Sequence, residues 1–403
     1  MVETNDKYMS SPEDTIIVCC ARIDMNEHII YKVRDALKRE LDWKYIIEKA
    51  HSHGVSSLLY HNLTKIRKFE EEFGVPEEIL KHLHRIYNGI VARSIFFYEE
   101  LQRILENFRQ EEIETAVLKG AALAETVYKD MGLRPFSDVD LLIHRDDLEK
   151  AKRKMAEMGY VLDENVTPQK YNEKFGCDLY YVGRIILEIH WDIARKIGSD
   201  KYTRIDIERL WERAIPAKVA GVDTLVLSPE DTLLHLCVHL QRHRYNRLIW
   251  LCDICEIIRQ NEIDWKYILE TAEKYRTRKY MYYGLLFTKK IIGGCDIPSE
   301  VMKRLRPPHL EAALFERVFL KEILSDEGKI LPIFNLLKTL LIDRMQDRMK
   351  YLCEYIFPPV EALARMYSVP QRKAFFYYVI HPLNLWFETS KRLMTIIGLR
   401  NRK

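Results

Sequence analysis

The chain has 403 residues, 47% of them hydrophobic, with 15 glycines and 14 prolines. This composition is sufficient for a sizeable buried core and excludes a disordered, collagen-like or low-complexity protein. The 63 basic side chains nearly balance the 60 acidic ones, and a net charge of +3 creates no global field for nucleic acid or an anionic membrane, so any such partner must bind a local patch.

The N-terminal sequence MVETNDKYMSSPEDT lacks the basic and apolar regions of a signal peptide. No stretch approaches the roughly 18 uninterrupted apolar residues of a membrane span. We therefore expect a cytoplasmic protein. Its eight cysteines are scattered along the chain, which is typical of reduced thiols and not of a disulfide framework.

Most of the chain has apolar residues at i, i+3 and i+4, which predicts a mainly α-helical protein. Between about residues 114 and 227, short β-type runs break this pattern. They are TAVL (115–118), SDVDLLI (137–143), LYYV (179–182), IILEIHW (185–191) and DTLVL (223–227). The expected fold class is α+β, a mixed β-sheet core with flanking helices. We expect the core at 112–227, between helical regions at 1–111 and 228–403.

Two short motifs occur twice in the same order. SPEDT stands at residues 11–15 and 228–232, and DWKYI stands at 42–46 and 264–268. SPEDT is a helix start, because Ser caps the free amides, Pro fits the first helical position and the acids face the positive helix end. The matches indicate a repeated helical unit, and convergent capping and packing chemistry is the alternative.

Carboxylates interrupt two of the predicted strands. Asp138 and Asp140 are two residues apart, so both point to one face, where a cation between them would relieve their repulsion. Glu188 interrupts an apolar run and shares its face with His190. Upstream, TAVL leads into Lys119, a glycine and a helix, a combination that makes an anion site.

These pieces, in this order, resemble the nucleotidyltransferase superfamily that includes DNA polymerase β and the aminoglycoside nucleotidyltransferases. The family pattern of a glycine turn, an Asp-hydrophobic-Asp/Glu strand and a later acid falls on Gly120, Asp138, Asp140 and Glu188. The wider context, LKGAALAETVYKDMGLRPFSDVDLLI followed by DTLLHLCVHL and LIWLCDI, is similar to the NTP_transf_5 type, a largely uncharacterised branch. This similarity covers most of residues 11–285. The chain departs from the pattern at Ala121, where the family has Ser or Gly, and in the long spacing between Gly120 and Asp138.

The resemblance implies an enzyme that moves a nucleoside monophosphate from a nucleoside triphosphate, with ATP expected, to a hydroxyl, releasing pyrophosphate. It implies two Mg²⁺ ions on the catalytic acids Asp138, Asp140 and Glu188. The implied ligands of the nucleotide are Lys119, Gly120, Arg134, Ser137 and His190. The expected acceptor is a small molecule, a peptide or a protein, and nucleic acid is less favoured because no basic stripe accompanies the core. The alternative is an inactive nucleotide-binding or scaffold protein that retains the fold.

Several of these residues also have simpler interpretations. Arg134 is either a phosphate ligand or a structural partner of Asp130 or Asp138, and Lys119 is either a phosphate ligand or a helix-start cation. Asp253 lies inside an apolar helix face, where it is expected to accept a hydrogen bond from a histidine or an arginine. The remaining candidates lie on helical patterns. The histidines His235, His239 and His243 either line the cleft or are packed or surface residues. We expect Cys252 and Cys255 to be buried thiols, and Trp43, Trp250 and Trp265 to lie in the core.

The segment 371–403 has seven basic residues against one acid, Glu388, with aromatic and aliphatic residues between them. This pattern fits an amphipathic segment for a membrane surface or a partner. We favour a final helix that packs on the helical bundle and ends in a frayed basic tail. The reason is that Pro382 and Asn384 are expected to break the segment into short pieces.

Overall fold

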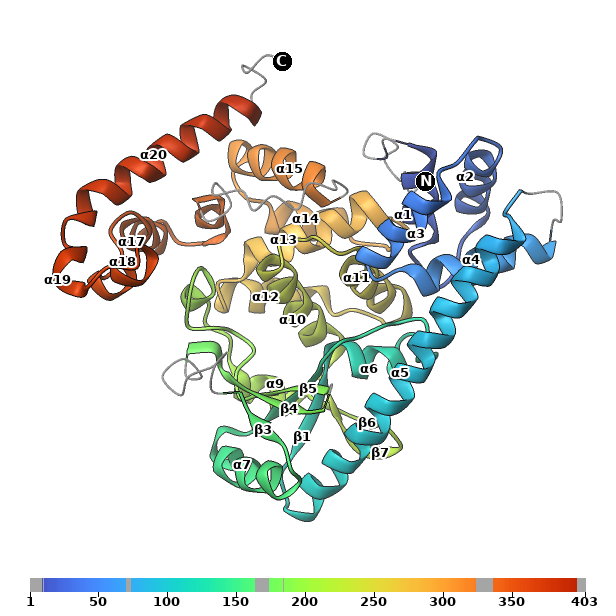
Figure 1. Ribbon diagram of the computed structural model, residues 1–403, viewed down its shortest axis with the longest axis horizontal. Coiled ribbons are helices and arrows are strands. Elements are labelled where there is room, and N and C mark those ends of the chain that lie inside the picture. Colours follow the sequence, from blue (N-terminus) through green and yellow to red (C-terminus); the bar gives the residue numbers. More distant parts are fainter. Residues whose placement is uncertain are drawn as a thin grey trace.

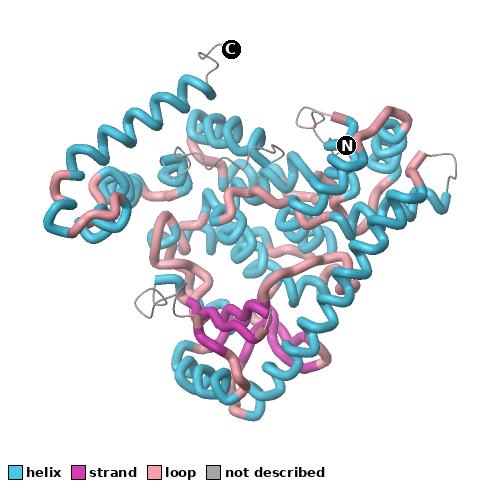
Figure 2. The backbone as a smooth tube through the Cα atoms, viewed as in Figure 1, coloured by secondary structure: helices cyan, strands magenta, loops and turns pink. Residues whose placement is uncertain are grey.

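The computed structural model describes residues 9, 11–69, 74–163, 174–183, 185–323 and 336–396. Helices form most of this part of the chain, and its strands form one seven-stranded mixed sheet (Figure 1; Figure 2). The predicted α+β class is confirmed. Among the described helices, none combines the length and the apolar character that crossing a membrane requires.

The sheet contains all five predicted strands and two further strands that the sequence pattern did not indicate. Its order is β3-β4-β5-β2-β1-β7-β6, so the two unpredicted strands, β3 and β6, lie at its edges. β3 has only two residues, and β6 contains a proline, which edge strands tolerate. The strands are β1 (Thr115–Leu118), β2 (Val139–Ile143), β3 (Val161–Leu162), β4 (Cys177–Val182), β5 (Ile185–His190), β6 (Ile215–Val219) and β7 (Val222–Val226).

The two faces of the sheet have different partners. One face packs on the second half of the long helix α5 (Glu77–Gln110) and on α7 (Leu148–Glu157), with residues such as Leu141 and Ile189 in that core. The other face packs into the apolar core of the helices at 12–69 and 229–323, which we call the helical body. Figure 1 shows the helical body on the far side of the sheet from α7. The second half of α5 thus shares a core with the sheet, whereas the domain boundaries themselves stay a prediction.

The repeated motifs begin equivalent helices. Tyr45 donates a hydrogen bond to Asp14 at 3.0 Å, and Tyr267 donates one to Asp231 at 2.9 Å. The two motifs therefore share this tertiary contact as well as their caps, as expected of a repeated helical unit. The first unit has α1 (Pro12–Cys20), α2 (Glu27–Leu37), α3 (Trp43–Ser52) and α4 (Ser56–Phe69), and the second has α10 (Pro229–Arg242), α11 (Leu248–Gln260), α12 (Trp265–Lys274) and α13 (Arg278–Phe287).

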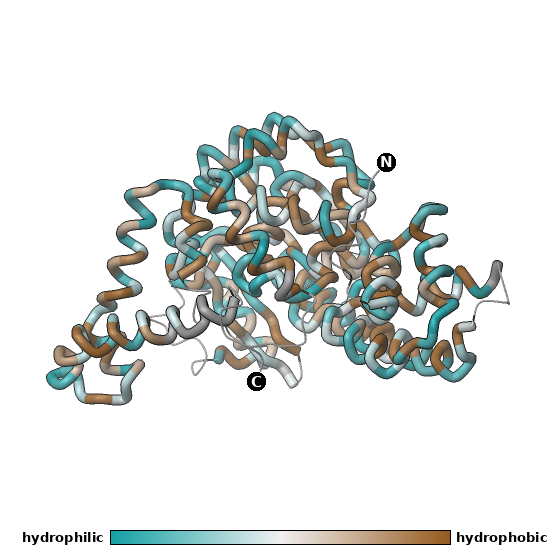
Figure 3. Tube along the Cα trace, turned by 90° about the horizontal axis from the view of Figure 1, so that it is seen from above, coloured by the Kyte–Doolittle hydropathy of each residue, from teal (hydrophilic) through white to brown (hydrophobic). Residues whose placement is uncertain are grey.

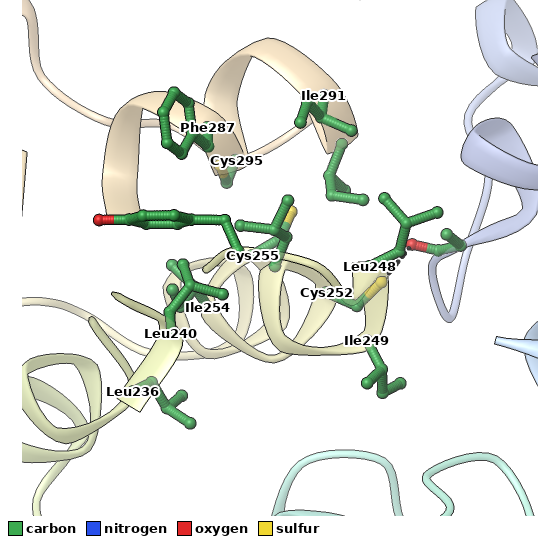
Figure 4. Packing of buried hydrophobic residues seen from close by; sticks show 14 of the residues in the cluster. Leu236, Leu240, Leu248, Ile249, Cys252, Ile254, Cys255, Phe287, Ile291 and Cys295 are labelled. Carbon is green, nitrogen blue, oxygen red and sulfur yellow. Dashed lines mark hydrogen bonds between the residues drawn. The ribbon is translucent and has the colours of Figure 1, made fainter. Parts of the chain in front are cut away.

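The two units share one apolar core around α11 (Figure 4). Cys252 on α11 donates a hydrogen bond from its thiol to the carbonyl oxygen of Ala21 at 2.9 Å, and the amide of Ile249 donates to the carbonyl of His53 at 3.2 Å. Cys252 and Cys255 are buried, as predicted. All eight cysteines lie in the described part of the chain, and none of them forms a disulfide.

The C-terminal helices form a lobe at the edge of the molecule (Figures 1 and 3). The prediction that Pro382 breaks this segment and that it packs on the bundle is wrong. α20 (Tyr377–Ile396) runs through Pro382 and packs on α17 (Met345–Ile356) and α19 (Gln371–Ala374), while most of its large apolar side chains are exposed. Pro382 lies in the second turn and removes one backbone hydrogen bond without dividing the rest of the helix.

The remaining helices are α6 (Lys119–Thr126), α9 (Ile207–Arg213), α14 (Ser299–Leu305), α15 (His309–Ile323) and α18 (Val360–Met366).

Candidate active site

The register of three strands brings the predicted acids together. β2 and β5 are parallel, with Asp140 opposite Glu188, and β1 is antiparallel to β2, with Leu118 opposite Asp140. Residues directly opposite each other in a sheet share a face, so both carboxylates point to the same side. Lys119 follows Leu118, and because the chain turns there with a positive φ instead of continuing the strand, its side chain reaches Asp140.

Four charged side chains form a network on this face. The ammonium nitrogen of Lys119 lies 2.5 Å from Oδ1 of Asp140. The Nε2 atom of His190 lies 2.9 Å from the same oxygen and 3.1 Å from Oε2 of Glu188. Asp140 and His190 are only 2% and 6% exposed, so the network is largely screened from water.

The network shifts the pKa of its members in opposite directions. Burial lowers the pKa of His190, but hydrogen bonds to Asp140 and Glu188 outweigh it, so this pKa lies above its ordinary value. Burial also lowers the pKa of Lys119, but the negative charges of Asp140 and Glu188 outweigh burial, so this pKa too lies above its ordinary value. For Glu188, burial raises the pKa, but His190 and Lys119 outweigh burial and hold it well below its usual range. The network thus favours the charged form of each of these groups.

Asp138 lies directly before β2 and is half-buried. The hydroxyl of Ser137 donates a hydrogen bond to its Oδ1 at 3.1 Å. Burial and the charges of Asp140 and Glu188 raise the pKa of Asp138, although Lys119 acts in the opposite direction. Negative charge at this position is therefore only partly compensated, which is the condition under which a bound cation stabilises a carboxylate.

The donor atoms around His190 indicate which kind of metal ion this site could bind. Asp140 and Glu188 each place a carboxylate oxygen within 3.1 Å of the same nitrogen of His190, so the two carboxylates lie close together. In the described chain, Cys177, Glu188 and His190 form a group of metal-type donors whose ligand atoms lie within 4.8 Å of one another. Burial raises the pKa of the Cys177 thiol to about 12, which disfavours a thiolate ligand. The carboxylate oxygens fit a hard cation such as Mg²⁺.

A pocket of about 470 Å³ opens over these residues. It is lined by six of the eight predicted site residues, whereas Glu188 and His190 do not belong to its lining. The six are Lys119, Gly120, Arg134, Ser137, Asp138 and Asp140.

The turn from β1 into α6 depends on close packing at Gly120. A Cβ atom at this position would lie 2.6 Å from the Cβ atom of Phe136 and 3.1 Å from Nη1 of Arg134. The segment before β2 can therefore approach the start of α6 only because residue 120 has no side chain. The preceding residue, Lys119, has a positive φ of 46° and completes the sharp turn.

Arg134 is bound by an acid from the helical body. Its Nη2 atom lies 2.6 Å from Oδ2 of Asp253, and its Nε atom lies 3.0 Å from Oδ1. Tyr128 donates a further hydrogen bond to Asp253 at 2.9 Å. The expectation that Asp253 accepts a hydrogen bond from an arginine or a histidine is confirmed, and Asp253 is the partner of Arg134 in place of the expected Asp130 or Asp138.

One wall of the pocket is a cluster of three aromatic rings, His239, His243 and Trp250. The ring centroids of His239 and His243 lie 5.1 and 4.9 Å from that of Trp250, and 4.5 Å from each other. Trp250, which we expected in the core, is half-buried and lines the pocket. His235 is only 2% exposed and does not line this pocket. The spacing of the histidines in the sequence indicated the position of His239 and His243 but not the third ring.

Positive charge dominates the described pocket lining. Arg93 and Arg247 add to Lys119 and Arg134, whereas the acids of the lining are Asp138 and Asp140. No sequence signal indicated Arg93, because α5 approaches the pocket from a distant part of the chain. A basic pocket that also holds paired carboxylates suits a polyphosphate bound together with a divalent cation.

Comparison with known proteins agrees with this geometry. A family model described as uncharacterised nucleotidyltransferase matches residues 39–293, well over half of the chain. The matched part includes the sheet, the pocket and the second helical unit. A search among curated proteins finds no match.

Proposed function

Because the chain belongs to this family of uncharacterised nucleotidyltransferases, we propose that it transfers a nucleoside monophosphate from a nucleoside triphosphate to a hydroxyl group of an acceptor. Pyrophosphate is the second product, Mg²⁺ is the proposed cofactor and ATP the proposed donor. The observation that carries the proposal is that Asp140 and Glu188 lie together on one face of the sheet, close enough to share the imidazole of His190, with Lys119 beside Asp140.

The proposed metal ligands are Asp138, Asp140 and Glu188, which would hold two Mg²⁺ ions. Bound Mg²⁺ supplies charge neutralisation on the phosphates and lowers the pKa of the acceptor hydroxyl. The ion pair between Lys119 and Asp140 then has a clear role. It compensates the buried carboxylate before substrates bind, and Lys119 is free to exchange that partner for a phosphate oxygen.

Further donors are arranged for the triphosphate. The backbone amides at the start of α6, beginning with Lys119 and Gly120, lie at the positive helix end, where anions bind. The exposed hydroxyl of Ser137 and the guanidinium of Arg134 line the same pocket. His190, whose raised pKa favours the imidazolium, adds positive charge beside the acids.

In the proposed reaction, the acceptor oxygen attacks the α-phosphorus and forms a new P–O bond. The bond between the α-phosphorus and the bridging oxygen to the β-phosphate breaks, and pyrophosphate leaves with that electron pair. Glu188, or a bound metal ion alone, is proposed to help remove the proton of the acceptor hydroxyl. Lys119 and Arg134 stabilise the charge that develops on the phosphates.

The acceptor is proposed to be a small molecule, a peptide or a protein side chain. A second candidate function is nucleotide binding or scaffolding without turnover. It is favoured by Ala121, which offers no hydroxyl at the position after Gly120. The two functions differ in whether the α-phosphate leaves the nucleotide.

The first test is calorimetry with ATP, CTP, GTP and UTP in the presence and absence of Mg²⁺. We expect Mg²⁺-dependent binding that is lost in the Asp138→Ala, Asp140→Ala variant. Asp223→Asn, which changes an exposed acid on β7 of the same sheet, is the matched control and should bind normally. If no nucleotide binds, or if the double variant binds as well as the unchanged chain, the proposed site is wrong.

The second test follows the α-phosphate. With α-labelled nucleotide and an extract of small molecules and peptides, the label should enter a product, and pyrophosphate should form. Asp140→Asn should abolish both. Tight Mg²⁺-dependent binding without pyrophosphate formation would instead support the scaffold.

A further inference from the structure

The C-terminal lobe exposes an unusual amount of apolar surface. In the described chain, 18 large hydrophobic side chains are exposed, and 11 of them lie between Met345 and Phe387. Scattered exposed apolar residues are normal, but a concentration in one segment indicates an interaction surface.

The exposed residues of α20 and of the turn before it follow a helical repeat. Trp386 and Phe387 are 70% and 61% exposed, and Phe376 is 69% exposed. Their spacing places them on one side of the helix, which therefore turns its apolar side to solvent. We name this surface the α20 stripe, formed by Phe376, Val379, Ile380, Leu383, Trp386 and Phe387.

Contacts on the opposite side of α20 fix this orientation. His381 is 4% exposed, its Nδ1 lies 2.9 Å from the hydroxyl of Tyr367, and its Nε2 lies 3.2 Å from the carbonyl oxygen of Tyr355. The ring of Tyr377 packs on that of Tyr367 at a centroid distance of 4.2 Å. α20 is thus held to α17 and α18 by its polar and tyrosine side, and rotation to bury the stripe would break these contacts.

Charge identifies the surface that would cover the stripe. Arg372 and Lys373, both exposed, come just before it, and Lys391 and Arg392 follow it in the sequence. Glu388 is the one acid of residues 371–403. We propose that the α20 stripe inserts into the surface of an anionic membrane, with Arg372 and Lys373 at the level of the lipid phosphates.

This charge pattern disfavours a second copy of the chain as the partner. Two stripes packed face to face would bring basic ends together in either orientation, with one glutamate on each helix to offset them. Tryptophan, phenylalanine and tyrosine side chains are well suited to the boundary between headgroups and acyl chains. The helix would lie in the membrane surface, in agreement with the lack of a membrane-spanning helix in the described chain.

The test is co-sedimentation of the full chain with phosphatidylcholine vesicles and with vesicles of equal parts phosphatidylcholine and phosphatidylserine. We expect binding to the anionic vesicles, weakened by salt. Trp386→Ser with Phe387→Ser should weaken this binding by at least about tenfold, because two buried apolar side chains are lost. Arg372→Gln with Lys373→Gln should weaken it by about twentyfold without affecting phosphatidylcholine vesicles.

The matched control is Leu310→Ser with Leu314→Ser, which removes exposed apolar side chains of α15 outside the stripe and should leave vesicle binding unchanged. Thermal unfolding of each variant shows whether the fold is retained. The proposal is overturned if the chain binds neither vesicle, or if the control variant loses binding as strongly as the stripe variant. It is also overturned if light scattering finds a dimer that Trp386→Ser with Phe387→Ser dissociates, since a second copy would then cover the stripe.

Discussion

The guanidinium of Arg134 is bound by the carboxylate of Asp253 through hydrogen bonds of 2.6 to 3.2 Å, although 119 positions separate the two residues. Arg134 lies in the segment before the acidic strand, and Asp253 lies on a helix of the second helical unit. Both are buried. The pocket over the acids therefore depends on the helical body as well as on the sheet.

Asp253→Asn is expected to destabilise the fold by about 3–5 kcal/mol, because it leaves the buried Arg134 without its charged partner. It should also weaken nucleotide binding by at least about tenfold, since the guanidinium is no longer held at the pocket. Urea unfolding and calorimetry measure the two effects. Asp200→Asn removes the partner of Arg242 at another buried ion pair and should destabilise without changing nucleotide affinity. Equal nucleotide affinity in both variants would contradict a positioning role for Asp253.

Gly120→Ala is expected to destabilise the chain by about 1–3 kcal/mol, because the new Cβ atom would lie 2.6 Å from Phe136. The clash should also push Arg134 or the start of α6 out of position and weaken nucleotide binding. At Gly89, in the helix α5, an added Cβ atom would meet no other atom within 4 Å, so Gly89→Ala should stabilise by about 0.5–1 kcal/mol. Thermal unfolding of both variants checks the contrast, and a neutral Gly120→Ala would show that the turn adapts.

Nucleotide binding is expected to raise the pKa of His243. Burial and the positive charges of Lys119 and nearby arginines lower this pKa to about 4, so His243 is neutral at pH 7. A bound triphosphate offsets those charges and favours the imidazolium. Because the complex then takes up a proton more readily than the free protein, affinity should increase as the pH falls from 7 toward 5. Histidine NMR titration with and without ATP measures the shift, and an unchanged pKa would place the triphosphate away from this wall.

Tyr45→Phe and Tyr267→Phe are expected to destabilise by similar amounts, about 1.5–3 kcal/mol each, because each removes a hydrogen bond to a buried carboxylate. The hydrogen bonds share no residue, so the effects should add in the double variant to within about 0.5 kcal/mol. Tyr31→Phe, at an exposed tyrosine on α2, is the control and should be neutral. Urea unfolding of the single and double variants measures this, and a negligible effect of either substitution would show that the two units are not equivalent.

The sequence by itself determined the local features. Short β-type runs predicted β1, β2, β4, β5 and β7, and the capping residues predicted the starts of α1 and α10. The spacing of Asp138 and Asp140 predicted which way their side chains point. These features depend on the two-residue period of a strand, on the helical period and on cap geometry. All three are determined by residues that are close together in the sequence.

Only the tertiary structure decided which distant residues meet. The parallel pairing of β2 with β5 places Asp140 beside Glu188, and nothing in either strand fixes that register alone. The same holds for the contact of Arg134 with Asp253 and for the position of Trp250 at the pocket. It also holds for α20, which we expected to pack on the helical bundle, whereas packing of His381 against Tyr367 leaves the apolar side of the helix exposed. A local pattern shows that a face is apolar or charged, but long-range packing selects what that face contacts.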